Sequence, residues 1–140
     1  MEADEKKKEL LGVIKKSIGE SLEIAKNIRE WLMECANLLR IEQGERVFSA
    51  LAEGIKNLGN LFEYVRELKN GTEHLKGFNV PSGYFECWEK SLNIFREMSS
   101  AFERKDWITL SDLIQYELQP LLLEGEKGLS ELEKSLDTVS

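Results

Sequence analysis

Apolar residues recur at seven-residue intervals through the first part of the chain, and this repeat constrains the fold more than any other feature. Side chains at this spacing lie on one face of an α-helix and are typical of helices that pack lengthwise against each other. The repeat therefore predicts a long helix over residues 4–42, with a break near Gly19 as the alternative. Its two interleaved series are Leu11, Ile18, Ala25, Leu32 and Leu39, and Ile14, Ser21, Ile28 and Cys35.

Three further segments carry apolar rows at helical spacing, and turn-forming residues separate them. Gly44 is suited to the position just after the first helix, and Asn70–Gly71 to the end of the second. Ser82 is an acceptable N-cap for the third helix, and Asp106 is a good one for the fourth. The predicted helices cover residues 45–69, 82–105 and 107–136, with a loop over 70–81.

The apolar rows of these helices define the expected core, and most of the aromatic residues, Trp31 among them, are interpreted as part of it. Pro120 lies within the fourth row, and because proline lacks a backbone N–H we expect a kink there. The rows are Phe48, Ile55 and Phe62 with Leu51, Leu58 and Val65; then Phe85, Trp88, Leu92, Phe95 and Phe102 flanked by Met98 and Ala101; then Trp107, Leu110, Leu113, Ile114, Leu118, Leu121, Leu122, Leu129, Leu132 and Leu136.

Four amphipathic helices with short connections predict an all-α fold: an antiparallel up-down-up-down four-helix bundle that forms a single domain over residues 1–140. The first and last helices are the longest, and in this topology the start of one lies beside the end of the other. We therefore expect their surplus lengths to pair as a two-helix extension, which frays or meets another chain. Gly125 and Gly128 would allow the two helices to approach closely there.

Negative charge is concentrated in the last quarter of the chain. The formal net charge is −7, and residues 106–140 hold two lysines against eight acidic residues. Such a surface repels a phosphate backbone, so the charge disfavours nucleic-acid binding. If the chain has a charged partner, we expect that partner to be basic.

Features that direct a chain to export or into a membrane are not evident in the sequence. The basic run 6–8 is not followed by an uninterrupted apolar stretch, so it does not predict a signal peptide. No stretch approaches the roughly 18 apolar residues of a transmembrane helix. Cys35 and Cys87 lie in apolar segments without a CxxC motif and are interpreted as reduced thiols. We expect a cytoplasmic location without membrane association.

Catalytic and metal-binding patterns require residues that this chain does not supply. A di-iron site of the ferritin type needs two Glu-x-x-His pairs, and the chain has one histidine. A Ser-His-Asp or Cys-His arrangement would have to use that same histidine, which nothing positions. Gly71, Gly77 and Gly83 are spaced too loosely for a phosphate-binding loop. We therefore predict no catalytic residue, no metal and no cofactor.

The single histidine lies in the run His74-Leu75-Lys76-Gly77, which resembles the phosphorylated motif of histidine phosphotransfer domains. Those domains are also four-helix bundles, and the resemblance implies a phosphate relay through His74. In that family the lysine and glycine follow the histidine by three and four positions, whereas here they follow by two and three. The family's histidine is exposed in the middle of a helix, whereas His74 follows a helix terminator. A solvated loop histidine is the simpler interpretation.

Glu117 is the acidic residue whose predicted position is the most unusual. It follows Ile114 and Leu113 by three and four residues, which places it on or beside the apolar face of the fourth helix. We interpret it as a carboxylate at the edge of the core, paired with Arg29 or Arg40 of the first helix. A catalytic role would need a pocket and a second converging group, and the sequence indicates neither.

Without a pattern for catalysis, the sequence favours a non-enzymatic protein-binding bundle: an adaptor, a small chaperone or an assembly subunit. A self-associating structural protein, such as a homodimer, is the alternative. Contact would use the two-helix extension or the acidic side of the fourth helix, where Trp107 is either a cap on the core or an exposed anchor. The candidate partner-binding residues are Trp107, Asp112, Tyr116, Glu117, Glu124 and Glu126.

The segment 106–122, DWITLSDLIQYELQPLL, resembles one found in small uncharacterised bacterial helical-bundle proteins. The resemblance implies a helical bundle and a bacterial origin. It implies no activity.

Overall fold

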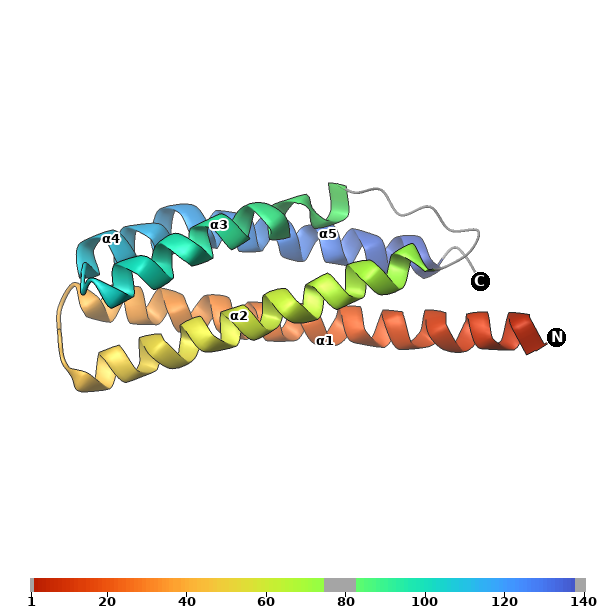
Figure 1. Ribbon diagram of the computed structural model, residues 1–140, viewed down its shortest axis with the longest axis horizontal. Coiled ribbons are helices and arrows are strands. Elements are labelled where there is room, and N and C mark those ends of the chain that lie inside the picture. The colour runs from red at the N-terminus through yellow and green to blue at the C-terminus, as the bar shows by residue number, and fades with distance from the viewer. Residues whose placement is uncertain (1, 75–82, 138–140) are drawn as a thin grey trace.

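The computed structural model describes residues 2–74 and 83–137, with side chains described from Glu5 onward, and within these residues helices are joined by short connections and no strand occurs. The last three elements follow each other without interruption and form one long rod, so the chain makes four rods, the first and last of them long (Figure 1). This confirms the predicted all-α four-helix architecture. The elements are α1 (Glu2–Leu39), α2 (Glu45–Glu73), α3 (Gly83–Glu103), α4 (Trp107–Asp112), the π-helical segment η1 (Leu113–Leu118) and α5 (Gln119–Asp137).

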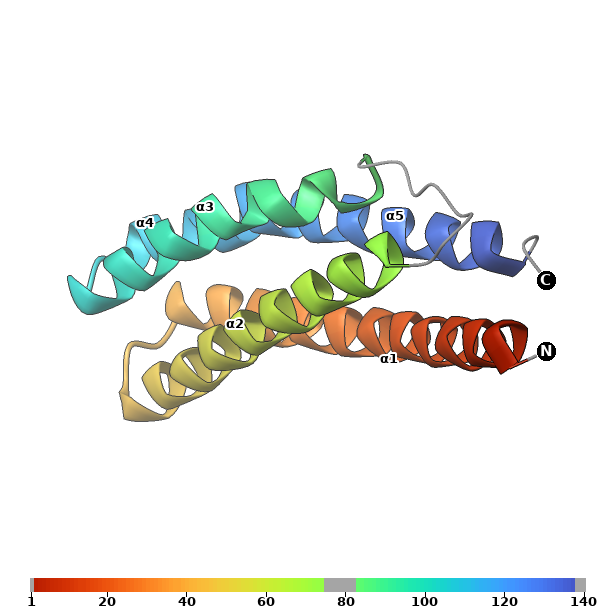
Figure 2. The same cartoon turned by 45° about the vertical axis from the view of Figure 1, so that its right-hand side comes forward.

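The four rods form two antiparallel hairpins that pack against each other (Figure 2). One hairpin is α1 with α2, and the other is α3 with the rod α4–η1–α5. α1 packs closely on both α2 and α5, whereas α2 and α3 contact each other more sparsely. The start of α1 and the end of α5 lie at the same end of the bundle, as the predicted topology requires (Figure 1).

The heptad repeat of α1 forms the central strip of the core. Every residue of its two series is buried, with exposed fractions between 0 and 8%. Ser21 is the polar member, and its hydroxyl donates to the Ser17 carbonyl over 2.8 Å, so the group is satisfied inside the helix. The helix is continuous through Gly19, because a fully buried stripe outweighs the cost of about 1 kcal/mol that a glycine imposes on a helix interior.

The connection from α1 to α2 differs in detail from the prediction. α1 ends at Leu39 rather than near residue 42, and Gly44 is the N-cap of α2 instead of a residue that closes α1. Its backbone is extended, with φ −153° and ψ 170°, so the left-handed conformation expected of a helix-closing glycine does not occur. Trp31, predicted to be core, is 44% exposed and lies along α2, where its indole N–H donates to the Ala50 carbonyl over 2.8 Å.

α2 continues past Asn70–Gly71, so the predicted loop over 70–81 is wrong for its first residues. Packing on α1 explains the difference: a Cβ at Gly71 would lie 3.8 Å from Cδ1 of Ile14, and Thr72 is fully buried. The Thr72 hydroxyl donates to the Lys69 carbonyl over 2.8 Å. Burial against α1 thus holds two residues of low helix propensity in a helical turn. The rest of that predicted loop, with Pro81 and Ser82, lies outside the described residues.

The core face of α3 is rotated relative to the predicted row. Met98 and Ala101, placed on the flank by the sequence, are fully buried. Leu92, Phe95 and Phe102 are only partly buried; the Phe95 ring meets Phe62 of α2 edge-on, and the Phe102 ring meets Trp107 of α4 edge-on.

The fourth rod contains a π-helical segment that ends just before Pro120, where the sequence predicts a kink. The Gln119 N–H donates to the carbonyl of Ile114, five residues earlier. Leu110, Ile114, Leu118 and Leu122 are spaced by four for three successive turns, more than the 3.6 residues of an α-turn. Wider turns keep these side chains on one side of the rod, and all four are buried.

Gly125 and Gly128 do allow a close approach, but the neighbour is α3 and not α1. A Cβ at Gly125 would lie 2.8 Å from Cε2 of Trp88, and one at Gly128 would lie 2.6 Å from the backbone oxygen of Tyr84. The end of α5 is well covered, since Leu132 and Leu136 are fully buried, whereas residues 5–10 of α1 are exposed. Among the described residues, the apolar side chains at the end of α5 are therefore covered, whereas Leu10 and Val13 near the start of α1 are exposed.

Candidate functional site

The fourth rod presents a row of exposed apolar side chains among acidic ones. Ile108 is 72% exposed, Tyr116 71% and Leu123 44%. Tyr116 and Leu123 are seven residues apart, about two helical turns, and therefore lie on the same side of the rod. We call this surface the outer face; it consists of Ile108, Asp112, Tyr116, Glu117, Leu123 and Glu124, all of which are exposed.

The structure corrects the predicted position of Glu117, which is exposed and not at the edge of the core. It lies within η1, where the wider turns carry it past the buried row. The two arginines proposed as its partners pair with other acids. Arg40 binds Asp112 over 2.9 Å at the surface, and Arg29 binds Glu126 over 2.8 Å between α1 and α5.

Glu126 is therefore a structural residue more than a surface one. Its side chain is 15% exposed and that of Arg29 is 17% exposed, and a second contact of 3.5 Å joins Nη2 of Arg29 to the other carboxylate oxygen. A carboxylate held in this way is not available to a partner. Of the six predicted partner-binding residues, Glu126 is thus one that the structure removes from the outer face.

Trp107 caps the core at the start of α4 instead of standing free as an anchor. Its ring stacks on Phe48 of α2 with centroids 4.3 Å apart and meets Phe102 of α3 edge-on at 5.6 Å. The cap of α4 is as predicted, since Asp106 accepts a hydrogen bond from the Thr109 N–H over 3.3 Å and one from the Thr109 hydroxyl over 2.7 Å. These bonds hold the pKa of Asp106 below its ordinary value.

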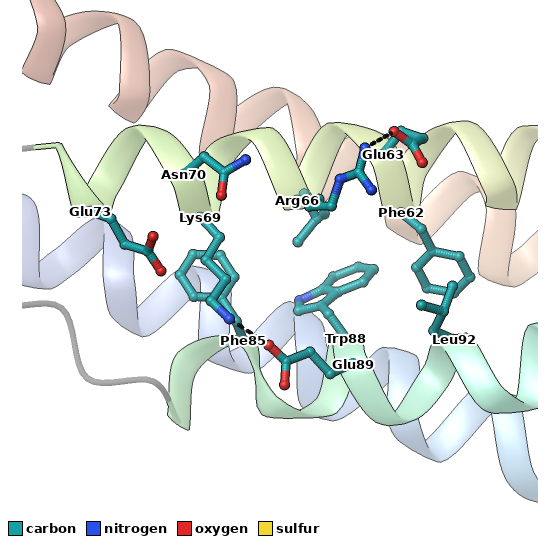
Figure 3. Close-up of a pocket in the computed structure, with 11 residues that line it drawn as sticks. Phe62, Glu63, Arg66, Lys69, Asn70, Glu73, Phe85, Trp88, Glu89 and Leu92 are labelled. Atoms are coloured by element: carbon teal, nitrogen blue, oxygen red, sulfur yellow. Dashed lines mark hydrogen bonds and ion pairs between the residues drawn. The ribbon is translucent and has the colours of Figure 1, made fainter.

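A pocket of about 300 Å³ opens between α2 and α3, where the two helices contact each other sparsely (Figure 3). Its floor is aromatic and aliphatic, and its rim carries charged side chains from both helices. No pattern in the sequence indicates it. The lining residues are Phe62, Glu63, Val65, Arg66, Lys69, Asn70, Glu73, Phe85, Trp88, Glu89 and Leu92.

Two ion pairs lie at the rim of this pocket, as Figure 3 shows. Lys69 of α2 binds Glu89 of α3 over 2.5 Å, and Arg66 binds Glu63 of the same helix over 2.7 Å. The hydrogen bond that Lys69 donates to Glu89 raises the pKa of Lys69, because it stabilises the charged ammonium group. No sequence pattern distinguishes Leu92 from the rest of its apolar row, but in the structure it is only partly buried and lines the pocket.

His74 lies at the C-terminal end of α2, where its Nδ1 is 2.6 Å from the Asn70 carbonyl oxygen. It is exposed and caps the helix instead of lying in the middle of one. Cys35 is buried and Cys87 partly buried, and both are free thiols. Burial raises the pKa of the Cys35 thiol, with a smaller contribution from Glu34.

Within residues 2–74 and 83–137, the structure brings no three histidine, cysteine or carboxylate side chains together as a metal site would. Among the same residues, no helix is long and apolar enough to cross a bilayer.

A family model described as a domain of unknown function, DUF8042, matches residues 16–127. The chain belongs to the DUF8042 family. The match covers most of the four rods, including the outer face up to Glu124 and the whole lining of the α2–α3 pocket. Neither the search of curated proteins nor the search of solved structures returned a match.

Proposed function

We propose that this DUF8042 protein is a non-enzymatic, protein-binding helical bundle that works as an adaptor, a small chaperone or an assembly subunit. The observation that carries the proposal is the outer face, where Ile108, Tyr116 and Leu123 are exposed apolar side chains of one rod. Large aromatic and aliphatic side chains on a surface are characteristic anchors of protein interfaces. Helical bundles commonly receive a partner helix along such a face.

The charge of the outer face favours a basic partner. Asp112, Glu117 and Glu124 flank the apolar row, and among the residues that the structure describes only Asp112 of these three is paired with an arginine, at 2.9 Å. Opposite charges at the rim of an interface accelerate association and select the partner more than they increase affinity. We therefore propose an amphipathic partner segment with lysine or arginine beside its apolar face, in a bacterial cytoplasm.

A photo-crosslinking amino acid placed at single positions in the native cell tests this proposal. We expect substitution at Tyr116 or Leu123 to give a discrete crosslinked product. The matched control is Glu67, which is exposed on α2 away from the outer face. Replacing both outer-face residues, Tyr116→Lys with Leu123→Lys, should abolish the product formed from a probe at Ile108.

The result that contradicts the proposal is equal crosslinking from Glu67 and from the two outer-face positions. An equally adverse result is a product from Ile108 that survives the double lysine variant. Circular dichroism of that variant serves as the folding control, and because both side chains are exposed we expect the helical signal to be retained.

Self-association is the second candidate, and a separate observation favours it. Leu10, Val13 and Ile24 are exposed on α1, and Val13 is 61% exposed. Their spacing of three and eleven residues places them along one side of the helix. Sedimentation at tens of micromolar separates the candidates: a concentration-dependent dimer that Val13→Lys dissociates supports self-association, and a monomer at every concentration removes it.

A further inference from the structure

The α2–α3 pocket lies on elements other than the outer face, so it can be considered independently of the proposed function. At about 300 Å³ it has the volume of roughly ten water molecules, at the lower end of the range for small-molecule sites. An occupant of about ten non-hydrogen atoms would fill it.

The floor of the pocket is part of the rigid core. Val65, Phe85 and Trp88 are between 2 and 4% exposed, and Phe62 meets the Trp88 ring edge-on at 6.2 Å. The Trp88 indole N–H already donates to the Gly125 carbonyl, so the floor offers ring surface instead of a free donor. Such a floor receives an apolar or aromatic body.

The cations at the mouth come from one face of α2. Arg66 and Lys69 are three residues apart and therefore neighbours on the helix surface. Arg66 uses Nη2 for Glu63, although a guanidinium has five N–H donors, and Lys69 has three donors for its bond to Glu89. Glu63 and Glu89 are each 64% exposed, so both pairs are surface ion pairs and are easily exchanged.

From these observations we propose that the α2–α3 pocket binds a small amphipathic carboxylate. The carboxylate would accept hydrogen bonds from Arg66 and Lys69 at the mouth, and the apolar body would lie on Trp88 between Phe85 and Leu92 (Figure 3). Bonds between a carboxylate and these two side chains are charge-assisted and are therefore stronger than neutral ones.

The carboxylates at the rim of the pocket raise a competing possibility, namely that the pocket binds a cation. Glu73 lies at the end of the pocket opposite Leu92, beyond Lys69, as Figure 3 shows. Because Glu63 and Glu89 already bind cations of the rim, Glu73 is the lining acid that would attract an amine. The test must therefore separate an anionic ligand from a cationic one of the same shape.

The experiment is calorimetric titration of the full chain with three matched compounds: 3-phenylpropionate, 3-phenylpropanol and 3-phenylpropylamine. We expect the acid to bind with a dissociation constant of about 1 mM or below and at least tenfold more tightly than the alcohol. Amide chemical shifts from α2 and α3 would locate the binding. The double variant Arg66→Gln with Lys69→Gln should weaken the acid about tenfold and leave the alcohol unchanged.

A matched control makes the same change in net charge elsewhere on α2. Arg46→Gln with Lys56→Gln alters two exposed cations outside the pocket lining and should leave binding of the acid unchanged. Equal binding of the acid and the alcohol, or tightest binding of the amine, overturns the assignment of an anion. Failure of all three compounds to bind, or shifts located on another surface, overturns the pocket as a ligand site.

Discussion

The indole N–H of Trp88 donates to the backbone carbonyl oxygen of Gly125 over 3.1 Å, which joins α3 to α5 inside the core. The contact depends on the glycine, because any Cβ at residue 125 would lie 2.8 Å from the indole ring. One residue thus supplies both the acceptor and the space. The same indole forms the floor of the α2–α3 pocket, so packing on α5 determines the position of that floor.

Replacing Gly125 with alanine should destabilise the bundle by about 1–3 kcal/mol, since the added methyl group must displace Trp88. The helix propensity of alanine offsets only about 1 kcal/mol of that cost. Gly12→Ala is the matched control, because no atom lies within 4 Å of its Cβ position, and it should raise stability by up to about 1 kcal/mol. Urea unfolding measures the free energy of unfolding of both variants. If Gly125→Ala stabilised the protein, that result would refute the close contact.

The ion pair between Arg29 and Glu126 should contribute more than the surface pairs do. Both side chains are mostly buried, and Glu126→Gln leaves the guanidinium poorly neutralised at a cost of about 1–3 kcal/mol. The exposed pair formed by Glu63 and Arg66 provides the comparison, and Glu63→Gln should cost less than about 0.5 kcal/mol. Unfolding free energies of equal size for the two variants would contradict the burial argument.

Relative to a regular α-helix, the π-helical segment accommodates one additional residue in the fourth rod. Deleting single residues tests this interpretation. Deleting the exposed Glu117 within η1 should let the rod become α-helical while Leu118 and Leu122 stay on the core side. Deleting the exposed Lys127 in α5 should instead rotate the following residues by about 100° and expose Leu129 and Leu132. We expect a cooperative thermal transition in the first variant and none in the second.

The cap of α4 should make stability depend on pH in a defined direction. Because hydrogen bonds from Thr109 lower the pKa of Asp106 from its ordinary 3.8, the charged carboxylate stabilises the folded state above that pH. The contribution is lost as the pH falls from 3.8 through the folded-state pKa. Asp106→Asn keeps a capping side chain without the charge. The parent should have a higher melting temperature than Asp106→Asn at pH 7, and this difference should vanish in strong acid. A difference in melting temperature that stays constant with pH would contradict a contribution from the charge of the cap.

α1 shows most clearly which part of the fold follows from the local sequence pattern. Its seven-residue repeat alone identified the buried face, because side chains at that spacing can share a core only if they lie on one helix. The cap at Asp106 is equally local, since a carboxylate and the N–H three residues on are neighbours whatever surrounds them. Periodicity and capping are properties of adjacent residues, and for that reason the sequence contains them.

The features that depend on distant residues needed the tertiary structure. The pair Asn70–Gly71 predicts the end of a helix, but α2 continues to Glu73 because Thr72 is buried on α1. The α2–α3 pocket exists because α3 turns Met98 into the core and leaves Leu92 partly open. Both outcomes are set by how closely neighbouring rods approach, a balance of packing between residues far apart in sequence that no local pattern encodes.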